Sequence, residues 1–234
     1  MLTSEIYAIK IPDKVDEELY NKFLKLVSYE KRKKLNYLLQ SQAAYCTLIA
    51  DVMIRFIICE KYKINNEKIE FKYNRYGKPF FSEISDFHFN LSHSGNWITC
   101  IVDNDIVGID IEKVFTLDLL SMSEGFFSKE EYQDFLLICP KERQNYFFDL
   151  WTLKESYLKA LGTGLNVPLN SFSIKKNSDR DISIVQSSTV QKIFFRQYFV
   201  QEGYKLSVCA TNNNFPRKII FKNLIEMQKV LQVF

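Results

Sequence analysis

The sequence of 234 residues has little glycine (7 residues) and little proline (5 residues), which excludes collagen-like and linker-like proteins. Cysteine is also sparse, and no two of the five cysteines have the C-x-x-C spacing of many zinc and redox sites. Their odd number gives no disulfide framework, so we interpret them as buried or incidental thiols of a protein in a reducing cytosol. They are Cys46, Cys59, Cys100, Cys139 and Cys209.

Long hydrophobic runs and a signal peptide are missing as well. No run approaches the roughly 18 apolar residues of a membrane span. The N-terminus carries charges at Glu5, Lys10, Asp13 and Lys14, where a signal peptide has an apolar stretch. We therefore expect a cytoplasmic protein without membrane contact.

A strong charge of one sign is absent too, because 31 Lys and Arg against 28 Asp and Glu give a net charge of only +3. Nucleic-acid-binding proteins more often show a strongly basic stripe, so we expect no nucleic-acid partner. A mildly basic surface suits an acidic partner protein or a phosphorylated small molecule.

What the sequence does contain is enough apolar material for a large core, since 47% of its residues are hydrophobic. Helical spacing predicts helices over 16–26, 43–62 and 146–161, and Ser128 with Glu131 predicts a capping box that begins another helix. Alternation predicts strands over 2–11, 68–73, 87–91, 97–102, 106–112, 171–175, 182–185, 193–200 and 205–210, with a hairpin at 103–105. This order predicts an α+β fold with an N-terminal half (1–105) and a C-terminal half (106–234).

The most informative segment is 107–112 (VGIDIE). In a strand, Asp110 and Glu112 lie on the same face, opposite to three apolar residues. Two neighbouring carboxylates repel each other unless a cation lies between them, and Mg²⁺ is bound by such oxygen ligands together with phosphate. Taken alone, the pattern favours a strand with a solvated acidic face, because short motifs give many false positives.

A second segment, 151–165, begins as a helix and ends at Gly162. Helical spacing places Trp151, Glu155 and Lys159 on one face, so Glu155 is a candidate third carboxylate and Lys159 a candidate phosphate contact. The alternative is an ordinary surface pair of Glu and Lys, worth only about 0.3–0.5 kcal/mol.

The third segment is 89–96 (FNLSHSGN), which contains one of the two histidines. Ser92 and His93 are adjacent in a predicted strand and face opposite ways, so they do not form a nucleophile and its base. A hydroxyl and an imidazole suit a phosphate or ribose contact, and the alternative for His93 is a structural histidine. His88 has no companion motif, and we interpret it as structural.

Together and in this order, the segments 90–94 (NLSHS), 108–112 (GIDIE) and 151–155 (WTLKE) with Lys159 resemble the signature blocks of the 4'-phosphopantetheinyl transferases. The resemblance is strongest to the surfactin-type (Sfp-type) branch, whose members prime nonribosomal peptide synthetases in antibiotic biosynthesis. It covers nearly the whole chain, because 30–34, 76–79, 126–132 and 171–173 also look like that branch.

The resemblance implies an α+β monomer of two similar halves related by a pseudo-twofold axis, with the active site in the cleft between them. It implies transfer of the 4'-phosphopantetheine moiety of coenzyme A to a serine of an apo peptidyl or acyl carrier protein, with Mg²⁺ as cofactor and adenosine 3',5'-bisphosphate released. By the resemblance, Asp110, Glu112 and Glu155 would hold the metal. The residues expected to contact coenzyme A are Lys31, Lys34, Lys78, Ser92, His93, Lys154 and Lys159.

The resemblance also implies the catalytic residues. Glu155 would take the proton of the carrier serine, Lys159 would stabilise the leaving group, and Glu131 matches an acidic position linked to the metal shell or to catalysis. One departure concerns Tyr45-Cys46, where relatives commonly have His-Arg and the arginine contacts the 3'-phosphate. Cys46 cannot make that charged contact.

Two rival interpretations follow from the same residues. One is a magnesium-dependent hydrolase, such as a nucleotide pyrophosphatase, and the other is a non-catalytic relative that binds carrier proteins. The sequence does not name the carrier protein. The apolar residues of segment 113–127 predict either a docking site for a carrier helix or part of the core; they are Val114, Phe115, Leu117, Leu119 and Leu120.

Overall fold

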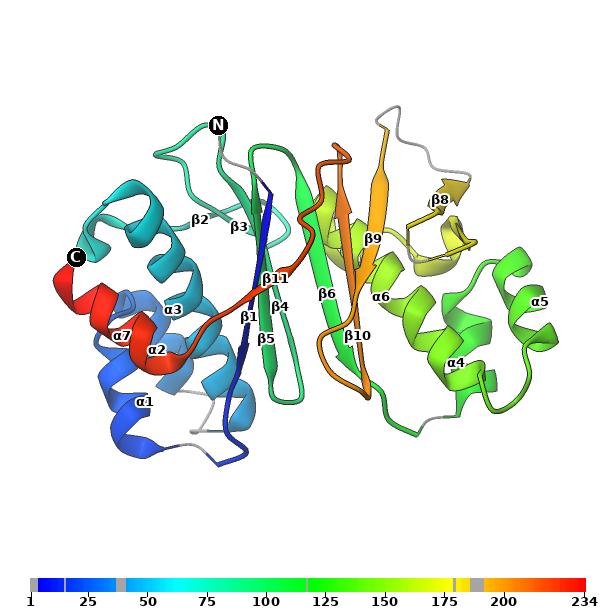
Figure 1. Cartoon of the computed structure of the whole chain (residues 1–234), viewed down its shortest axis with the longest axis horizontal. Helices are drawn as coiled ribbons and strands as arrows, with labels where there is room; N and C mark the ends of the chain where they lie inside the picture. Colours follow the sequence, from blue (N-terminus) through cyan, green and yellow to red (C-terminus); the bar gives the residue numbers. More distant parts are fainter. Residues whose placement is uncertain (1–3, 15, 37–40, 117, 179, 186–191) are drawn as a thin grey trace.

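The computed structural model describes residues 4–14, 16–36, 41–116, 118–178, 180–185 and 192–234, and it places two β-sheets side by side with helices on their outer flanks (Figure 1). The first sheet has the strand order β11-β1-β5-β4, and the second has the order β6-β10-β9. Their strands are β1 (Glu5–Lys10), β4 (His88–Ser94), β5 (Trp97–Asp103), β6 (Val107–Lys113), β9 (Phe194–Tyr198), β10 (Tyr204–Ala210) and β11 (Ile219–Phe221). The α+β class is therefore confirmed.

The first sheet is covered by helix α3 (Gln42–Tyr62), and helices α1 (Glu17–Leu24) and α2 (Tyr29–Asn36) pack against α3. Asp16 and Ser41 cap α1 and α3 by accepting backbone N–H bonds, as short polar side chains do at helix starts. Helix α3 lies at the centre of the largest apolar cluster. By length and composition it meets the criterion for a membrane span, contrary to our expectation from the sequence, yet 83% of its most apolar window is buried inside the protein.

The second sheet is covered by helix α6 (Arg143–Leu161), and helices α4 (Leu119–Phe126) and α5 (Lys129–Leu137) pack against α6. The predicted capping box of Ser128 and Glu131 at the start of α5 is confirmed. The predicted end of α6 at Gly162 is also confirmed, because this glycine has the left-handed conformation typical of a helix C-terminus. Helix α6 packs directly on β6 and β10.

The connections between the sheets differ from the prediction. The hairpin expected at 103–105 is wrong, because β5 and β6 belong to different sheets and the chain crosses from the first to the second at this point. The last residues return, since β11 pairs with β1 in parallel and α7 (Leu224–Val233) packs on α3. The predicted half 106–234 thus gives its final strand and helix to the other sheet.

Within the described residues, the remaining elements are two short hairpins and three 3₁₀ turns. They are β2 (Lys72–Tyr73) with β3 (Pro79–Phe80), β7 (Ser173–Lys176) with β8 (Ile182–Val185), η1 (Asn66–Lys68), η2 (Gly164–Asn166) and η3 (Leu169–Ser171). A further apolar cluster joins the two sheets, because it contains Ile6 and Ile101 from the first and Ile109 and Val208 from the second. The two halves therefore share part of one core.

Candidate active site

The site begins with the close approach of helix α6 to strand β6 at Gly108. A Cβ atom at this position would lie 2.0 Å from the carbonyl oxygen of Ser156 and 2.5 Å from the amide nitrogen of Ala160. Only a residue without a side chain lets the helix come this near. The contact brings Glu155 and Lys159 of α6 over the carboxylates of β6.

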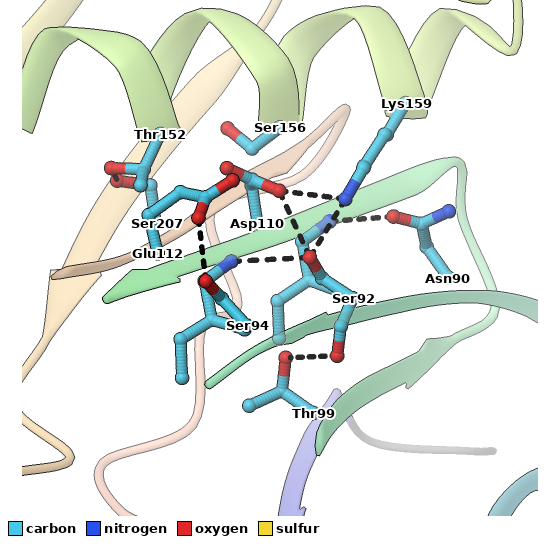
Figure 2. A network of polar contacts seen from close by, with 12 residues as sticks. Asn90, Ser92, Ser94, Thr99, Asp110, Glu112, Thr152, Ser156, Lys159 and Ser207 are labelled. Atoms are coloured by element: carbon cyan, nitrogen blue, oxygen red, sulfur yellow. Dashed lines mark hydrogen bonds and ion pairs between the residues drawn. The ribbon is translucent and has the colours of Figure 1, made fainter. Parts of the chain in front are cut away.

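The predicted carboxylates do meet at this place. Asp110 is buried and Glu112 is half-buried on the face of β6 that looks toward α6 (Figure 2). Burial raises the pKa of Asp110, Glu112 and Glu155, and the negative charge of Asp110 raises the pKa of the other two further. A hydrogen bond from Trp151 to Glu112 opposes that shift, which gives the first residue of the 151–155 segment a part in the site.

Lys159 supplies the positive charge in this cluster. Its Nζ atom lies 2.6 Å from Asp110 Oδ1 and donates a second hydrogen bond of 2.8 Å to Ser92 Oγ (Figure 2). Ser92 Oγ in turn donates to Asp110 Oδ1 at 2.9 Å. Ser92 is therefore a buried partner of the β6 carboxylate, whereas the sequence assigned it to coenzyme A.

The donors present fit a hard divalent cation, although their arrangement is not that of a formed metal site. Within the described ranges, no three His, Cys, Asp or Glu side chains are gathered closely enough to hold a metal ion. The Oδ2 atom of Asp110, however, is buried and has no hydrogen-bond partner in the part of the chain that the structure describes, and carboxylate oxygens are the ligands that Mg²⁺ prefers. Lys159 here takes the role of counterion to Asp110.

A cavity of about 290 Å³ lies on the neighbouring face of the first sheet. His93 lines it, together with Lys31, Asp51, Phe71 and Tyr73. The last four also line a second cavity of about 300 Å³, which includes Lys34. Burial lowers the pKa of His93, as do the charges of Lys159 and Lys31, while Asp110 raises it. His93 thus faces the cavity while the neighbouring Ser92 faces the carboxylates, and the two side chains point in opposite directions as the sequence predicted.

Two residues that line the second cavity, Asp51 and Arg55, had no signal in the sequence analysis. Asp51 accepts a 2.6 Å hydrogen bond from Arg55 and lies 3.6 Å from the Nζ atom of Lys31. Both residues lie on α3 one turn apart, in a helix whose residues are mostly apolar. Their pairing fixes Lys31 at the cavity wall.

Lys78 has a different place from the one predicted. Its Nζ atom donates to the carbonyl oxygens of Val107 (3.2 Å), Lys159 (2.6 Å) and Ala160 (3.1 Å), so it caps the C-terminal end of α6. A cation there interacts favourably with the helix dipole. Burial nevertheless lowers the pKa of Lys78 to about 8. The three donors of its ammonium group are taken by these carbonyls, so the phosphate contact that we expected would require Lys78 to leave them.

Glu131 and Lys154 are likewise placed away from the cluster. Lys154 is 1% exposed, lies 2.7 Å from Glu131 and donates to the carbonyls of Leu169 and Phe172. Glu131 accepts from the backbone of Ser128 and Ile174. The pair ties α5, α6 and the segment before β7 together, and the pyrophosphate and catalytic roles that we expected for the two residues stay predictions.

Cys46, the position of the departure, is 3% exposed. Its thiol points to the carbonyl of Gly95 at 3.9 Å, which is a weak contact. Among the apolar residues of 113–127, Val114 and Leu119 pack against the second core. Phe115 and Leu120 are half exposed, at 51% and 49%, and Leu117 lies outside the described residues. The segment therefore divides between core and surface.

Fold and site together define a protein that presents carboxylates and a lysine beside a cavity suited to an anion, and the comparisons with known proteins agree. A model described as the 4'-phosphopantetheinyl transferase superfamily matches residues 106–209, and one described as 4'-phosphopantetheinyl transferase, N-terminal, matches residues 14–104.

The chain is 37% identical over 223 residues to 4'-phosphopantetheinyl transferase Sfp of Bacillus subtilis (strain 168), across 95% of this chain and 99% of that protein. It is 34% identical over 230 residues to 4'-phosphopantetheinyl transferase gsp of Aneurinibacillus migulanus, across 98% and 94%. A solved holo-(acyl-carrier-protein) synthase from Bacillus anthracis in complex with CoA (3',5'-ADP) is 17% identical over 44% of this chain and 92% of that one, with a TM-score of 0.40. The chain belongs to the Sfp-type 4'-phosphopantetheinyl transferases.

Proposed function

We propose that the protein transfers the 4'-phosphopantetheine moiety of coenzyme A to a serine of an apo carrier protein and releases adenosine 3',5'-bisphosphate. One observation carries this proposal. Three carboxylates and one lysine lie near one another beside the cavity that Lys31 and His93 line; they are Asp110, Glu112, Glu155 and Lys159. Phosphoryl transfer depends mainly on positioning and on neutralising charge, and the site offers groups for both.

Asp110, Glu112 and Glu155 are the residues that would hold Mg²⁺. When bound, the ion neutralises charge on the phosphate oxygens. The unpaired Oδ2 atom of Asp110 and the raised pKa values of the three carboxyl groups support this assignment, because a divalent cation relieves both the lost hydrogen bond and the repulsion.

The cations at the two cavities suit the nucleotide end of coenzyme A. Lys31 and His93 stand at the cavity next to the carboxylates, and Lys34 stands at the adjoining one, where it also lies over the Tyr73 ring at 5.4 Å. Exposed ammonium groups bind phosphate as point charges. With Cys46 buried, these residues are the available partners for the 3'-phosphate.

The two remaining roles fall to residues of α6. Glu155 is half-buried with a raised pKa, which suits a base that takes the proton of the carrier serine. Lys159 exchanges Asp110 for a phosphate oxygen and stabilises the departing bisphosphate, a movement that its partly exposed side chain allows.

The proposal includes the surroundings of the reaction. We place the carrier protein on Phe115 and Leu120, the half-exposed apolar residues that follow β6. We also propose a cytoplasmic monomer whose halves are related by a pseudo-twofold axis and which serves nonribosomal peptide or related antibiotic biosynthesis. Each sheet is covered by one long helix, α3 and α6, which is consistent with such an axis.

The test is intact-protein mass spectrometry of an apo peptidyl carrier protein incubated with the enzyme, coenzyme A and Mg²⁺. We expect the mass of one phosphopantetheine to be added, and the addition to be lost with EDTA. Asp110→Ala should abolish transfer without unfolding the protein, and wild-type transfer by that variant would contradict the metal assignment. Cleavage of coenzyme A without transfer would indicate a hydrolase, and binding of carrier protein without either reaction would indicate a non-catalytic relative.

A further inference from the structure

Strands β4 and β6 are the facing edges of the two sheets, and they are joined by side chains instead of backbone pairing. Asn90 Oδ1 accepts the N–H of Ile109 (2.9 Å), Ser92 Oγ that of Ile111 (3.3 Å) and Ser94 Oγ that of Lys113 (3.0 Å). Both partners advance by two residues at each step, so the strands run parallel. Three side chains on one face of β4 thus form a polar ladder to β6.

Two of the three side chains also reach the carboxylates. Ser94 Oγ lies 2.6 Å from Glu112 Oε2, and Ser92 Oγ lies 2.9 Å from Asp110 Oδ1 (Figure 2). Asn90 makes the same kind of bond to β6 and no contact with Asp110 or Glu112 that the structure records.

The direction of each bond follows from the capacity of a hydroxyl group, which has one proton and two lone pairs. The N–H of Lys113 can only donate, so the proton of Ser94 is left for Glu112. At Ser92 both lone pairs are taken, by Ile111 N–H and Lys159 Nζ, and its proton goes to Asp110. Each serine is therefore held by β6 while it holds a carboxylate of β6.

We propose that Ser94 is a positioning residue for the metal site: it fixes Glu112 in the orientation that binds the ion, and it does so from the opposite half of the molecule. The inference rests on the proposed function. Glu112 stands near the exposed end of β6, where a carboxylate with three rotatable bonds has few other restraints among the described residues, apart from its hydrogen bond with Trp151.

The test measures binding of Mn²⁺ alone by electron paramagnetic resonance, and the Mg²⁺ dependence of transfer. Loss of a residue that orients a metal ligand typically weakens metal affinity about 10–100-fold. We expect Ser94→Ala to raise the Kd for Mn²⁺ and the KM for Mg²⁺ within this range, with kcat at saturating Mg²⁺ close to that of the wild type. Ser94→Thr keeps the hydroxyl group and should restore both constants.

Two controls separate positioning from general damage to the fold. Thr99→Val removes a buried hydroxyl that donates to the carbonyl of Ser92 and lies on the next strand, so it should leave the Kd for Mn²⁺ unchanged. In a Glu112→Ala background, Ser94→Ala should weaken Mn²⁺ binding no further, because the carboxylate that Ser94 orients is already absent.

The outcomes distinguish the inference from the function on which it rests. Unchanged Mn²⁺ binding in folded Ser94→Ala, or an additive loss in the double variant, would overturn the role of Ser94 while the transferase proposal stands. No Mn²⁺ binding by an active wild-type enzyme would overturn the metal site and the role of Ser94 together. A melting temperature near that of the wild type shows that each variant is folded.

Discussion

Buried charged side chains account for much of the difference between the residues that we expected at the site and those that are there. Lys78 and Lys154 lie in the segments that resemble the transferase family, 76–79 and 151–155. The Nζ atoms of both lysines donate to backbone carbonyls. Lys159 differs from them because its partners are the side chains of Ser92 and Asp110, which a ligand can replace. At the residue scale, partners that a ligand can replace separate Lys159, the lysine that we propose for catalysis, from Lys78 and Lys154.

Lys78 gives a prediction for the pH dependence of stability. Its pKa falls from 10.5 in the unfolded chain to about 8 in the folded protein because of burial. The unfolded chain therefore holds more protons between pH 8 and 10.5, so this group makes stability rise with pH across that window. Urea unfolding at pH 7.5 and 9.5 should show a smaller rise for Lys78→Met than for the wild type. An equal rise in both would contradict the assignment.

The buried pair of Glu131 and Lys154 gives the second prediction. Lys154→Met leaves Glu131 buried without its partner and should cost about 3–5 kcal/mol of unfolding free energy. Adding Glu131→Gln removes the stranded charge and should recover most of the loss, as measured by urea unfolding. If the pair is structural, the double variant retains kcat, whereas a catalytic role for Glu131 predicts a loss of kcat in a folded protein.

At the scale of elements, the site depends on how α6 lies on β6. Both elements were predicted closely from local patterns, since 106–112 and 146–161 correspond to β6 (Val107–Lys113) and α6 (Arg143–Leu161). Their contact at Gly108 determines whether Glu155 and Lys159 reach the carboxylates. No other residue type fits at the 2.0 Å separation found there.

Gly108→Ala should therefore damage both stability and activity. The added methyl group must push α6 outward, and overpacking of this kind typically costs about 1–3 kcal/mol or more. We expect a lower melting temperature and a fall in kcat under conditions where the variant is folded. Gly125→Ala is a matched control, because a Cβ atom at Gly125 meets no atom within 4 Å. Equal behaviour of the two variants would contradict the packing that we describe.

At the scale of the whole molecule, three features join the halves: the β4–β6 ladder, the apolar cluster shared by both sheets, and the return of β11 and α7 to the first sheet. After the predicted division at residue 106, strands β6, β9 and β10 belong to the second sheet, whereas β11 belongs to the first. A site built across the junction thus belongs to a molecule that we expect to unfold as one unit.

The two tryptophans allow a direct measurement, because Trp97 lies on β5 in the first sheet and Trp151 on α6 over the second. The single-tryptophan variants Trp151→Phe and Trp97→Phe report the unfolding of each half by fluorescence. After correction for the stability of each variant by circular dichroism, both probes should coincide with the loss of secondary structure. A fluorescence midpoint that differs from the circular dichroism midpoint of the same variant would show independent halves.

Local order was determined by the sequence itself. Each feature that was predicted well involves residues within a few positions of one another. These features are the alternation of 107–112, the helical spacing of Trp151, Glu155 and Lys159, the capping box of Ser128 and Glu131, and the helix end at Gly162. Such features depend on backbone geometry and near neighbours, which one sequence contains in full. The joint order of three motifs likewise identified the family.

The tertiary structure alone decided which partners these side chains find. Lys159 meets Asp110 from 49 positions away, Lys78 reaches the carbonyl of Lys159 from 81, and Ile219 pairs with Ile6 at the other end of the chain. A lysine has the same flexible side chain and charge whether it meets phosphate or a helix end, so its type and spacing do not encode the outcome. Burial and contacts with residues distant in the sequence decide the role of the lysine. They determine whether its N–H donors are already bonded to the protein or remain available to a ligand.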